Sequence, residues 1–501
     1  MSALLRVAAA DVVLVLAGLA VVGPPARRLA VPVVPRLATA FVTGAGLLAL
    51  VGTVTGVLGG PTGVLPLVGP ALGAAAVAGL VLAAGPAARR WRTSPTVPGG
   101  PARWPRADGA WFGYAVTATV TTRFAAAGWH NPVYSNDEYM MWALRGRVLA
   151  AGHLDPLVFG GAANGLAYPS REYPLGLPVL YSWVSGWAGP RWAEVAAHIQ
   201  VPLLGGAALL VAVWTLRTTS GVPAGVLVAP AFFAVAWVGR YTGVLFFADL
   251  PVAAAGLVVA LLVLHWLRTR QPGCLLLAVG PAVAAVLLKE EGLVFVTAPC
   301  LAAAGCALTE RRRQPAGRWW LPLVLLGAAL AARLPWQLWL AGQGVGSRFL
   351  RPPQPRYGAA DTLHLIRLVG QQLIRLWPEP YPVVWIGLPV LLSAALAVLL
   401  PPLRRDVCYL GGTLVLLLGG IWAQYVLVGL ADPNGPDGLA GYMAFNAPRV
   451  LLLPTVLCWV LALLSAGAAL TRPAPAPPAL PAPPAPEAPR AGVSEPQMRR
   501  Q

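Results

Sequence analysis

The sequence predicts an all-α protein, a polytopic transmembrane helix bundle with about 13–14 spans. Three observations lead to this fold class. Of the 501 residues, 57% are hydrophobic and only 11% are charged. Apolar runs of bilayer length recur from end to end, and basic residues gather between them. A soluble domain carries about 25% charged residues, so the composition excludes a soluble enzyme, a disordered chain and a fibrous protein.

Apolar runs of about 20 residues, the length that crosses a bilayer as a helix, locate the spans. We place them at 8–23, 38–59, 63–86, 111–129, 176–190, 195–216, 222–247, 249–267, 273–288, 292–307, 319–340, 381–400, 407–430 and 449–468. The first run has the length of a signal peptide. Further spans follow it at once and no small-residue cleavage site comes after it, so we expect it to remain as a helix.

The formal net charge of +18 comes almost entirely from arginine, and Lys289 is the only lysine. We interpret this charge as a topology signal and not as a nucleic-acid footprint, because arginine marks the cytoplasmic loops of membrane proteins. The compact basic clusters, which we therefore place in the cytoplasm, lie at 87–106, 268–270, 311–313 and 404–405. The clusters predict a cell-membrane protein (plasma or inner membrane) with a defined outer side.

The other connecting segments then face the extracytoplasmic side: the one after residue 129 and those around 289–291, 341–380 and 431–448. This topology requires an even number of crossings between residues 175 and 249. Three apolar runs lie there, so either 222–247 crosses twice or one run is re-entrant.

The chain divides into four predicted parts: additional N-terminal transmembrane helices at 1–87, a basic cytoplasmic linker at 88–108, a membrane core at 109–470 and a Pro-rich, disordered cytoplasmic tail at 471–501. The core has two long outer loops, 130–175 and 341–380, and long structured loops usually carry function. We expect interfacial helices in both. The first contains Trp142, with Arg145 and Arg147 at headgroup level, and the second is Asp361–Leu376.

The densest polar cluster of the first outer loop contains the adjacent acids Asp137 and Glu138. Two neighbouring carboxylates can supply a general base or hold a divalent metal ion. A solvated helix cap is the alternative, since Asp is a good N-cap and Glu suits the first turn. The same loop ends with Arg171 and Glu172 between prolines, which is either a stiff entry loop with a surface ion pair or part of a site.

Further ionisable residues lie at the ends of apolar runs on the same side. Asp249 opens one run, and Lys289, Glu290 and Glu291 separate two others. Ionisable groups at the edge of the hydrocarbon are functional-site candidates. The alternatives are an ordinary helix start for Asp249 and a hairpin turn with snorkelling charges for the other three.

Arginines on the outer side oppose the positive-inside bias and so require another explanation. Arg333 lies inside an apolar run, and Arg348, Arg351 and Arg356 follow in the outer loop. Arg333 either snorkels to the surface or faces an anionic ligand in the bundle interior. Phosphate is the ligand that the planar guanidinium group matches best.

The order of these motifs resembles the GT-C superfamily of integral membrane glycosyltransferases, especially bacterial members of the ArnT, protein mannosyltransferase and RgtA–D-like type. The resemblance covers roughly residues 110–345. Its motifs, in order, are Asp137-Glu138, Tyr168-Pro-Ser-Arg-Glu-Tyr-Pro-Leu-Gly-Leu-Pro178, Asp249-Leu-Pro251, Lys289-Glu-Glu-Gly292 and Leu334-Pro-Trp336. The spans before residue 100 and the proline-rich tail fall outside this pattern.

The resemblance implies an inverting transfer of a sugar from a polyprenyl-phosphate-linked donor to a glycan, lipid or protein acceptor on the extracytoplasmic face. It implies that Asp137 is the general base, with Glu138 beside it. The substrate-binding candidates are Arg171, Glu172, Tyr173, Asp249, Lys289, Glu290, Glu291, Arg333, Arg348 and Arg351. No cofactor is certain, and a divalent metal ion stays open because relatives differ in this respect. The expected partners are the donor, the acceptor and membrane lipids, with no nucleic acid.

Two other functions remain open at this point. A multi-pass transporter or lipid-linked-sugar flippase would show charged positions near the middle of helices and two similar halves. We find no internal repeat. A catalytically inactive relative that assists assembly is the third interpretation.

Overall fold

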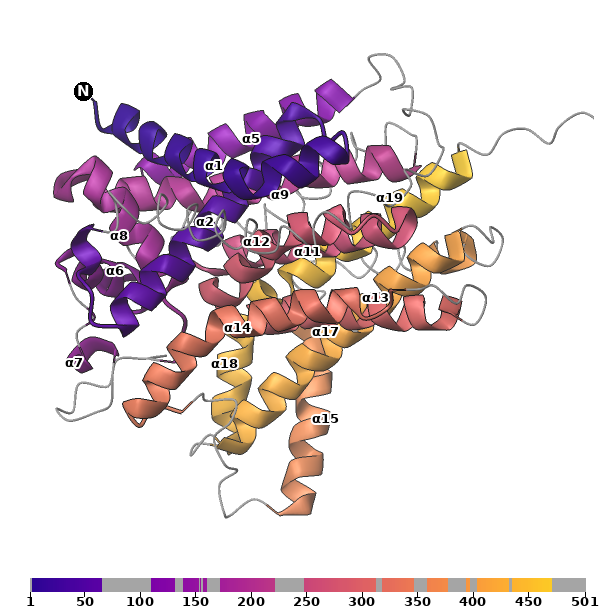
Figure 1. Ribbon diagram of the computed structural model, residues 1–501. Coiled ribbons are helices and arrows are strands. Elements are labelled where there is room, and N and C mark those ends of the chain that lie inside the picture. Colours follow the sequence, from indigo (N-terminus) through magenta and orange to yellow (C-terminus); the bar gives the residue numbers. More distant parts are fainter. Residues whose placement is uncertain are drawn as a thin grey trace, which may run out of the picture.

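The computed structural model describes residues 2–64, 110–130, 138–152, 154, 156–159, 172–220, 247–311, 318–346, 358–376, 393–396, 403–431 and 435–470. These residues form helices, and none of them forms a strand. The predicted all-α class is confirmed. The bundle is drawn in Figure 1.

The N-terminal half contributes α1 (Ala3–Arg28), α2 (Val33–Val57), η1 (Thr62–Val64), α5 (Ala110–His130), the π-helix η2 (Glu138–Ala143), α6 (Leu144–Ala150), α7 (Pro156–Phe159), α8 (Gly176–Ala188), η3 (Pro190–Trp192) and α9 (Ala193–Ser220). The C-terminal half contributes α11 (Asp249–Thr269), α12 (Gly273–Leu288), α13 (Gly292–Arg311), α14 (Leu321–Gly342), α15 (Ala359–Leu376), α17 (Arg404–Ala431), α18 (Gly435–Val450) and α19 (Leu452–Leu470). Helices α11 and α12 lie centrally, between α2 and α9 on one side and α13 and α14 on the other (Figure 1).

Seven described helices are long and apolar enough to cross a membrane, which confirms a multi-pass membrane protein. They are Ala3–Arg28, Val33–Val57, Pro190–Thr218, Asp249–Thr269, Gly292–Glu310, Leu321–Gly342 and Arg404–Ala431. Two shorter apolar helices, Gly273–Leu288 and Leu452–Ala466, lie among them. The expected spans at 63–86, 222–247 and 381–400 lie almost entirely outside the described residues.

Helix α8 bears on the odd number of runs between residues 175 and 249. It has 13 residues, fewer than the roughly 17 that a transmembrane helix needs, and nearly all of them are buried in the bundle. If α8 does not cross the bilayer, two runs remain in that interval. The topology is then satisfied without a double crossing at 222–247.

Helices α1 and α2 cross with their backbones in contact. A Cβ atom at Gly18 would lie 1.8 Å from the carbonyl oxygen of Ala40, and one at Gly44 would lie 2.0 Å from that of Leu14. Lipid tails are as apolar as the helix surface, so the hydrophobic effect does not drive helices together in a membrane. Small residues at such crossings instead allow the backbones to approach closely and pack. These contacts hold the first two helices together.

We therefore expect Gly18→Val to separate α1 from α2 and to lower the unfolding temperature of the purified protein by several degrees. Gly23→Val is the matched control, since a Cβ there meets nothing within 4 Å. Thermal unfolding in detergent, followed by loss of monodispersity, measures both. Equal unfolding temperatures for the two variants would contradict the importance of this crossing.

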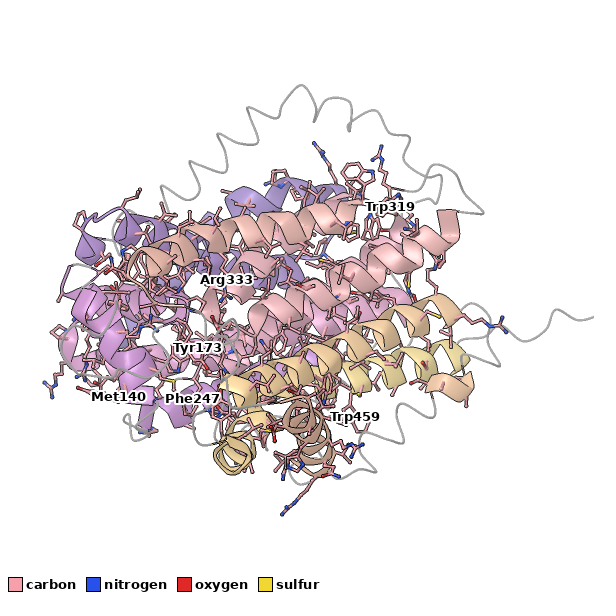
Figure 2. All side chains as sticks on the ribbon, turned by 90° about the horizontal axis from the view of Figure 1, so that it is seen from below. Met140, Tyr173, Phe247, Trp319, Arg333 and Trp459 are labelled. Atoms are coloured by element: carbon pink, nitrogen blue, oxygen red, sulfur yellow. The ribbon has the colours of Figure 1, made fainter. Side chains whose placement is uncertain are left out.

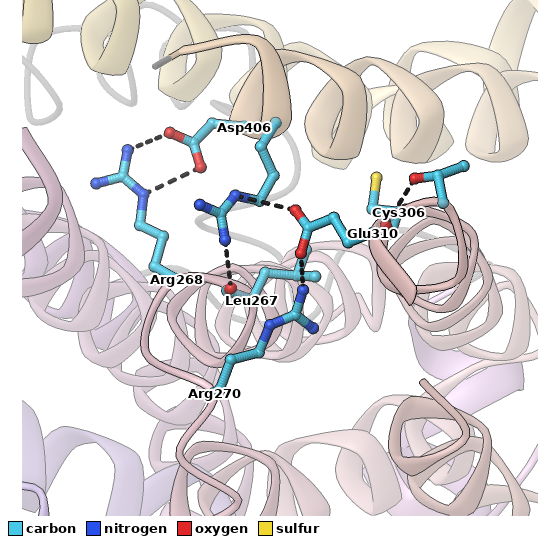
Figure 3. A network of polar contacts seen from close by, with 8 residues as sticks. Leu267, Arg268, Arg270, Cys306, Glu310 and Asp406 are labelled. Atoms are coloured by element: carbon cyan, nitrogen blue, oxygen red, sulfur yellow. Dashed lines mark hydrogen bonds and ion pairs between the residues drawn. The ribbon is translucent and has the colours of Figure 1, made fainter. Parts of the chain in front are cut away.

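Charged residues gather at the two ends of the central helices. At one end Arg268 pairs with Asp406, while Glu310 pairs with Arg270 and with Arg405, the latter at 3.3 Å (Figure 3). Asp249 lies at the opposite end of α11, 21 residues and about 30 Å away, which is the thickness of the hydrocarbon core. The basic clusters 268–270 and 404–405 thus lie at one end of the bundle, as expected for loops on one side of a membrane.

Asp406 and Glu310 differ in burial, and this predicts different effects on stability. The side chain of Asp406 is 6% exposed and that of Glu310 is 34% exposed. Loss of a buried partner strands a charge, whereas solvent screens an exposed pair. We expect Asp406→Asn to lower the free energy of unfolding by about 2 kcal/mol or more and Glu310→Gln by at most about 1 kcal/mol. Unfolding of both variants in mixed micelles measures these losses. A larger loss for Glu310→Gln than for Asp406→Asn would contradict the argument from burial.

Candidate functional site

Seven of the predicted site residues are described with their side chains. Six of them lie at one end of the bundle, and the side chain of Arg333, from near the middle of α14, reaches them. Glu172 and Tyr173 precede α8, Asp249 opens α11, Lys289, Glu290 and Glu291 connect α12 to α13, and Arg333 lies in α14. All seven side chains are buried. In Figure 2, Tyr173 and Arg333 lie in the part of the molecule that also contains Phe247, away from Trp319 at the start of α14.

Five predicted residues cannot be placed in this way. Asp137, Arg171, Arg348 and Arg351 lie outside the described residues. Glu138 begins the π-helix η2, but its side chain is not described. Their part in the site remains a prediction from the sequence.

Lys289 lies at the centre of the site, between two carboxylates. Its Nζ atom donates to Oδ1 of Asp249 at 2.8 Å and pairs with Oε1 of Glu291 at 3.1 Å. The extended backbone at Lys289 ends α12 and turns the side chain back over the start of α11. Burial alone would lower the pKa of Lys289, but the two carboxylates outweigh it and raise the pKa above its ordinary value of 10.5. The ammonium group is therefore permanently charged at physiological pH.

Arg333 and Glu290 form a second buried pair beside the first. Nη2 of Arg333 donates to Oε1 of Glu290 at 3.0 Å, and Nη1 donates to the carbonyl oxygen of Val286 at 3.4 Å. Of the two interpretations of Arg333, snorkelling to the surface is therefore wrong, since the side chain faces the bundle interior. Its charge is compensated by Glu290.

The turn at Glu172 and Tyr173 is held by aromatic and basic side chains. Trp336 donates from Nε1 to the carbonyl oxygen of Glu172 at 3.2 Å, and the ring of Tyr173 stacks on that of Trp142 at 5.5 Å. Nζ of Lys289 lies 5.9 Å from the centroid of the Tyr173 ring. The Tyr-Pro and Leu-Pro-Trp motifs, separated by roughly 160 residues, thus meet through backbone and ring contacts.

Arg145 differs from the expectation. We expected it at headgroup level beside Trp142, but the side chain is 2% exposed, and its Nη2 donates to the carbonyl oxygen of Tyr173 at 2.9 Å. Its guanidinium group lies over the rings of Phe159 and Trp336. Burial lowers the pKa of Arg145 to about 9, partly offset by Glu172, so it keeps its charge at neutral pH. Arg145 supports the turn from within, and only Arg147 is well exposed to solvent.

Sequence reasoning missed the contribution of α18. The stretch 431–448 was expected to be an outer connection, but Gly435–Val450 is helical. From its last turn, Nη1 of Arg449 reaches Oδ2 of Asp249 at 3.9 Å, and its guanidinium group lies over the ring of Phe247. The signal in the sequence was a single arginine, the first residue of the last apolar run.

The six central charges balance. Asp249, Glu290 and Glu291 oppose Lys289, Arg333 and Arg449, with each carboxylate within 4 Å of a cation. Next to them is a small, partly open hollow, lined by Glu291, Gln424, Tyr425, Val428, Tyr442 and Val450. The described side chains include no group of three or more His, Cys, Asp or Glu residues that could hold a metal ion.

The arrangement provides buried acceptors and donors of hydrogen bonds in a low-dielectric site, which contacts η2 through the stacked rings of Tyr173 and Trp142. Such a site can bind and orient a polar ligand at the end of a membrane bundle. No protein-family model matches the chain, and no curated protein or solved structure is significantly similar to it.

Proposed function

We propose that this protein is a membrane glycosyltransferase of GT-C type, which moves a sugar from a polyprenyl-phosphate-linked donor to a cell-envelope acceptor on the extracytoplasmic face. The single observation that carries the proposal is the convergence of Tyr173, Asp249, Lys289 and Arg333 on one buried site. Tyr173, Asp249 and Lys289 come from three separate motifs of the resemblance, and Arg333 directly precedes a fourth, Leu334-Pro-Trp336. The order of these residues along the chain does not by itself bring them together in space, so their proximity is an independent observation.

The proposed reaction is a direct displacement at the anomeric carbon. Asp137 takes the proton of the acceptor hydroxyl as its oxygen attacks that carbon. The bond from the anomeric carbon to the phosphate oxygen breaks, and the polyprenyl phosphate leaves with the electron pair. It departs as an anion and needs cations, not a general acid.

The ion pairs of the site support a choice among the cations that could bind the phosphate of the donor. Lys289 and Arg333 are each already held by a carboxylate. In this proposal they organise the site, and Arg171, Arg348 and Arg351 receive the phosphate. A phosphate added beside the paired charges would have to displace a carboxylate, which is costly.

A lipid-linked-sugar flippase is the second candidate, because Arg333 lies near the middle of α14, between Leu321 and Gly342. A buried cation within a membrane helix is common in transport pathways. A flippase also needs no binding site for a sugar acceptor, whereas a glycosyltransferase does.

One experiment separates these functions. The purified protein is placed in liposomes with a polyprenyl phosphate that carries a labelled sugar, and a cell-envelope extract supplies acceptors. We expect the label to pass to the acceptor. Label that crosses the bilayer while still attached to its lipid would support the flippase instead. Label that does neither would contradict both functions.

A further inference from the structure

The hollow beside the charged cluster has the chemistry of a binding site for a neutral, hydroxyl-bearing group. It lies where the start of α13 meets the last turns of α17 and α18. Glu291 and Gln424 line it together with the aromatic residues Tyr425 and Tyr442. Their side chains offer a carboxylate, an amide and two phenols, and two valines complete the wall.

Glu291 has an unused acceptor in this place. Its Oε1 atom pairs with Lys289 at 3.1 Å, while Oε2 is buried and has no hydrogen-bond partner among the described residues. The residue is 5% exposed. A buried carboxylate oxygen without a donor has lost its hydration, and no hydrogen bond compensates for this loss. A ligand hydroxyl that donates to Oε2 would remove this penalty.

The charge balance determines what kind of donor fits. Three buried acids already compensate three cations within the cluster. A charged ligand in the adjacent hollow would leave a net charge in a low-dielectric region, which is costly. A neutral hydroxyl group satisfies Oε2 without disturbing the balance. The hollow has room for about one water-sized group, so only a hydroxyl group at the edge of a ligand enters it.

The two tyrosine rings favour a sugar over other alcohols. Their centroids lie 6.0 Å apart in an edge-to-face arrangement, so the hollow combines apolar ring surface with polar groups. A sugar presents C–H bonds and hydroxyl groups side by side. Gln424 can donate to one ligand oxygen and accept from another hydroxyl.

We propose that this hollow, lined by Glu291, Gln424, Tyr425 and Tyr442, binds a hydroxyl-bearing edge of a neutral sugar. In the proposed reaction, on which this role rests, that sugar is the group carried by the donor. The hollow then selects the sugar, while the outer-loop arginines recognise the lipid phosphate.

The test compares binding of two lipids, a short-chain polyprenyl phosphate and the same lipid carrying mannose, glucose, galactose or arabinose. We expect wild type to prefer at least one sugar-bearing lipid. Tyr425→Phe and Gln424→Leu should each weaken that binding by about 3- to 10-fold, the effect of one lost hydrogen bond, and leave binding of the sugar-free lipid unchanged. Glu291→Gln should weaken binding of the sugar-bearing lipid about 10-fold or more, but this variant also removes one of the carboxylates that pair with Lys289.

Tyr409→Phe is the matched control. Tyr409 is also a buried tyrosine of α17, but near its other end, and its hydroxyl donates to the carbonyl oxygen of Ala260 at 2.8 Å. This variant should bind both lipids as wild type does. If Tyr425→Phe and Gln424→Leu bind the sugar-bearing lipid as well as Tyr409→Phe, the proposed sugar site is wrong.

A second measurement keeps this inference separate from the proposed function. Saturation-transfer NMR with the free neutral monosaccharides, and with glucuronate and glucosamine as charged analogues, needs no lipid carrier. Neutral sugars that bind wild type more tightly than Tyr425→Phe support the hollow even if no donor is ever consumed. Binding of neither the lipid-linked nor the free sugars, or preference for a charged analogue, overturns it.

Discussion

Asp137→Asn is expected to reduce sugar transfer by about 10²- to 10⁴-fold and to leave donor binding nearly unchanged. An amide cannot take the proton of the acceptor hydroxyl, so the attacking oxygen stays a poor nucleophile. Donor recognition is assigned to other residues and should persist. The measurement is the initial rate of label transfer from the polyprenyl-phosphate sugar, together with the KM of the donor.

Two variants make the result interpretable. Asp108→Asn makes the same chemical change in the predicted cytoplasmic linker, on the other side of the membrane, and should keep wild-type activity. Glu138→Gln tests the neighbouring acid and should lower the rate less than Asp137→Asn. Full activity in Asp137→Asn would refute the assignment of the base. Loss of activity in Glu138→Gln alone would transfer that role to Glu138.

The bilayer-length helices and the charged ends of the bundle were predictable because both follow from local composition. Asp249, at the start of one apolar run, and Lys289, between two others, had to lie near the same membrane surface. The sequence could place them on one side of the membrane. It could not pair them, because pairing depends on which helices are neighbours.

Arg449 and Arg145 show where sequence reasoning ends. Arg449 is far along the chain from its partner Asp249, and only the packing of α18 against α11 brings them together. Helix α18 itself was hidden by turn-forming residues at its start, although Gly435-Pro436 is compatible with a first helical turn. Arg145 looked like an interfacial residue because charge usually marks the solvent side. Its burial depends on Phe159 and Trp336, which lie on other helices.

The second large effect concerns the stability of the site and not the reaction. Lys289→Met should lower the free energy of unfolding by about 3–5 kcal/mol, since it leaves the carboxylates of Asp249 and Glu291 buried without their shared cation. Arg449, at 3.9 Å from Asp249, compensates only one of them. Unfolding in mixed micelles measures the loss. Arg367→Met, an exposed position on α15, should change stability by less than about 0.5 kcal/mol.

A double variant separates lost charge compensation from lost packing. In Asp249→Asn/Lys289→Met the stranded carboxylate of Asp249 is gone, so we expect it to be more stable than Lys289→Met alone, with a coupling of about 1 kcal/mol or more. A double variant at least as unstable as the sum of the single variants would show that Lys289 contributes by its volume and not by its charge.

The pH dependence gives an independent check. Because the pKa of Lys289 is raised in the folded protein above its ordinary value of 10.5, its contribution to stability is complete below pH 10.5 and is lost only as pH rises through the folded pKa. The loss of unfolding free energy caused by Lys289→Met should therefore not decrease between about pH 6 and 9. A loss that shrinks as pH rises within this range would mean that the ammonium group loses its proton there. The two carboxylates would then not dominate its environment.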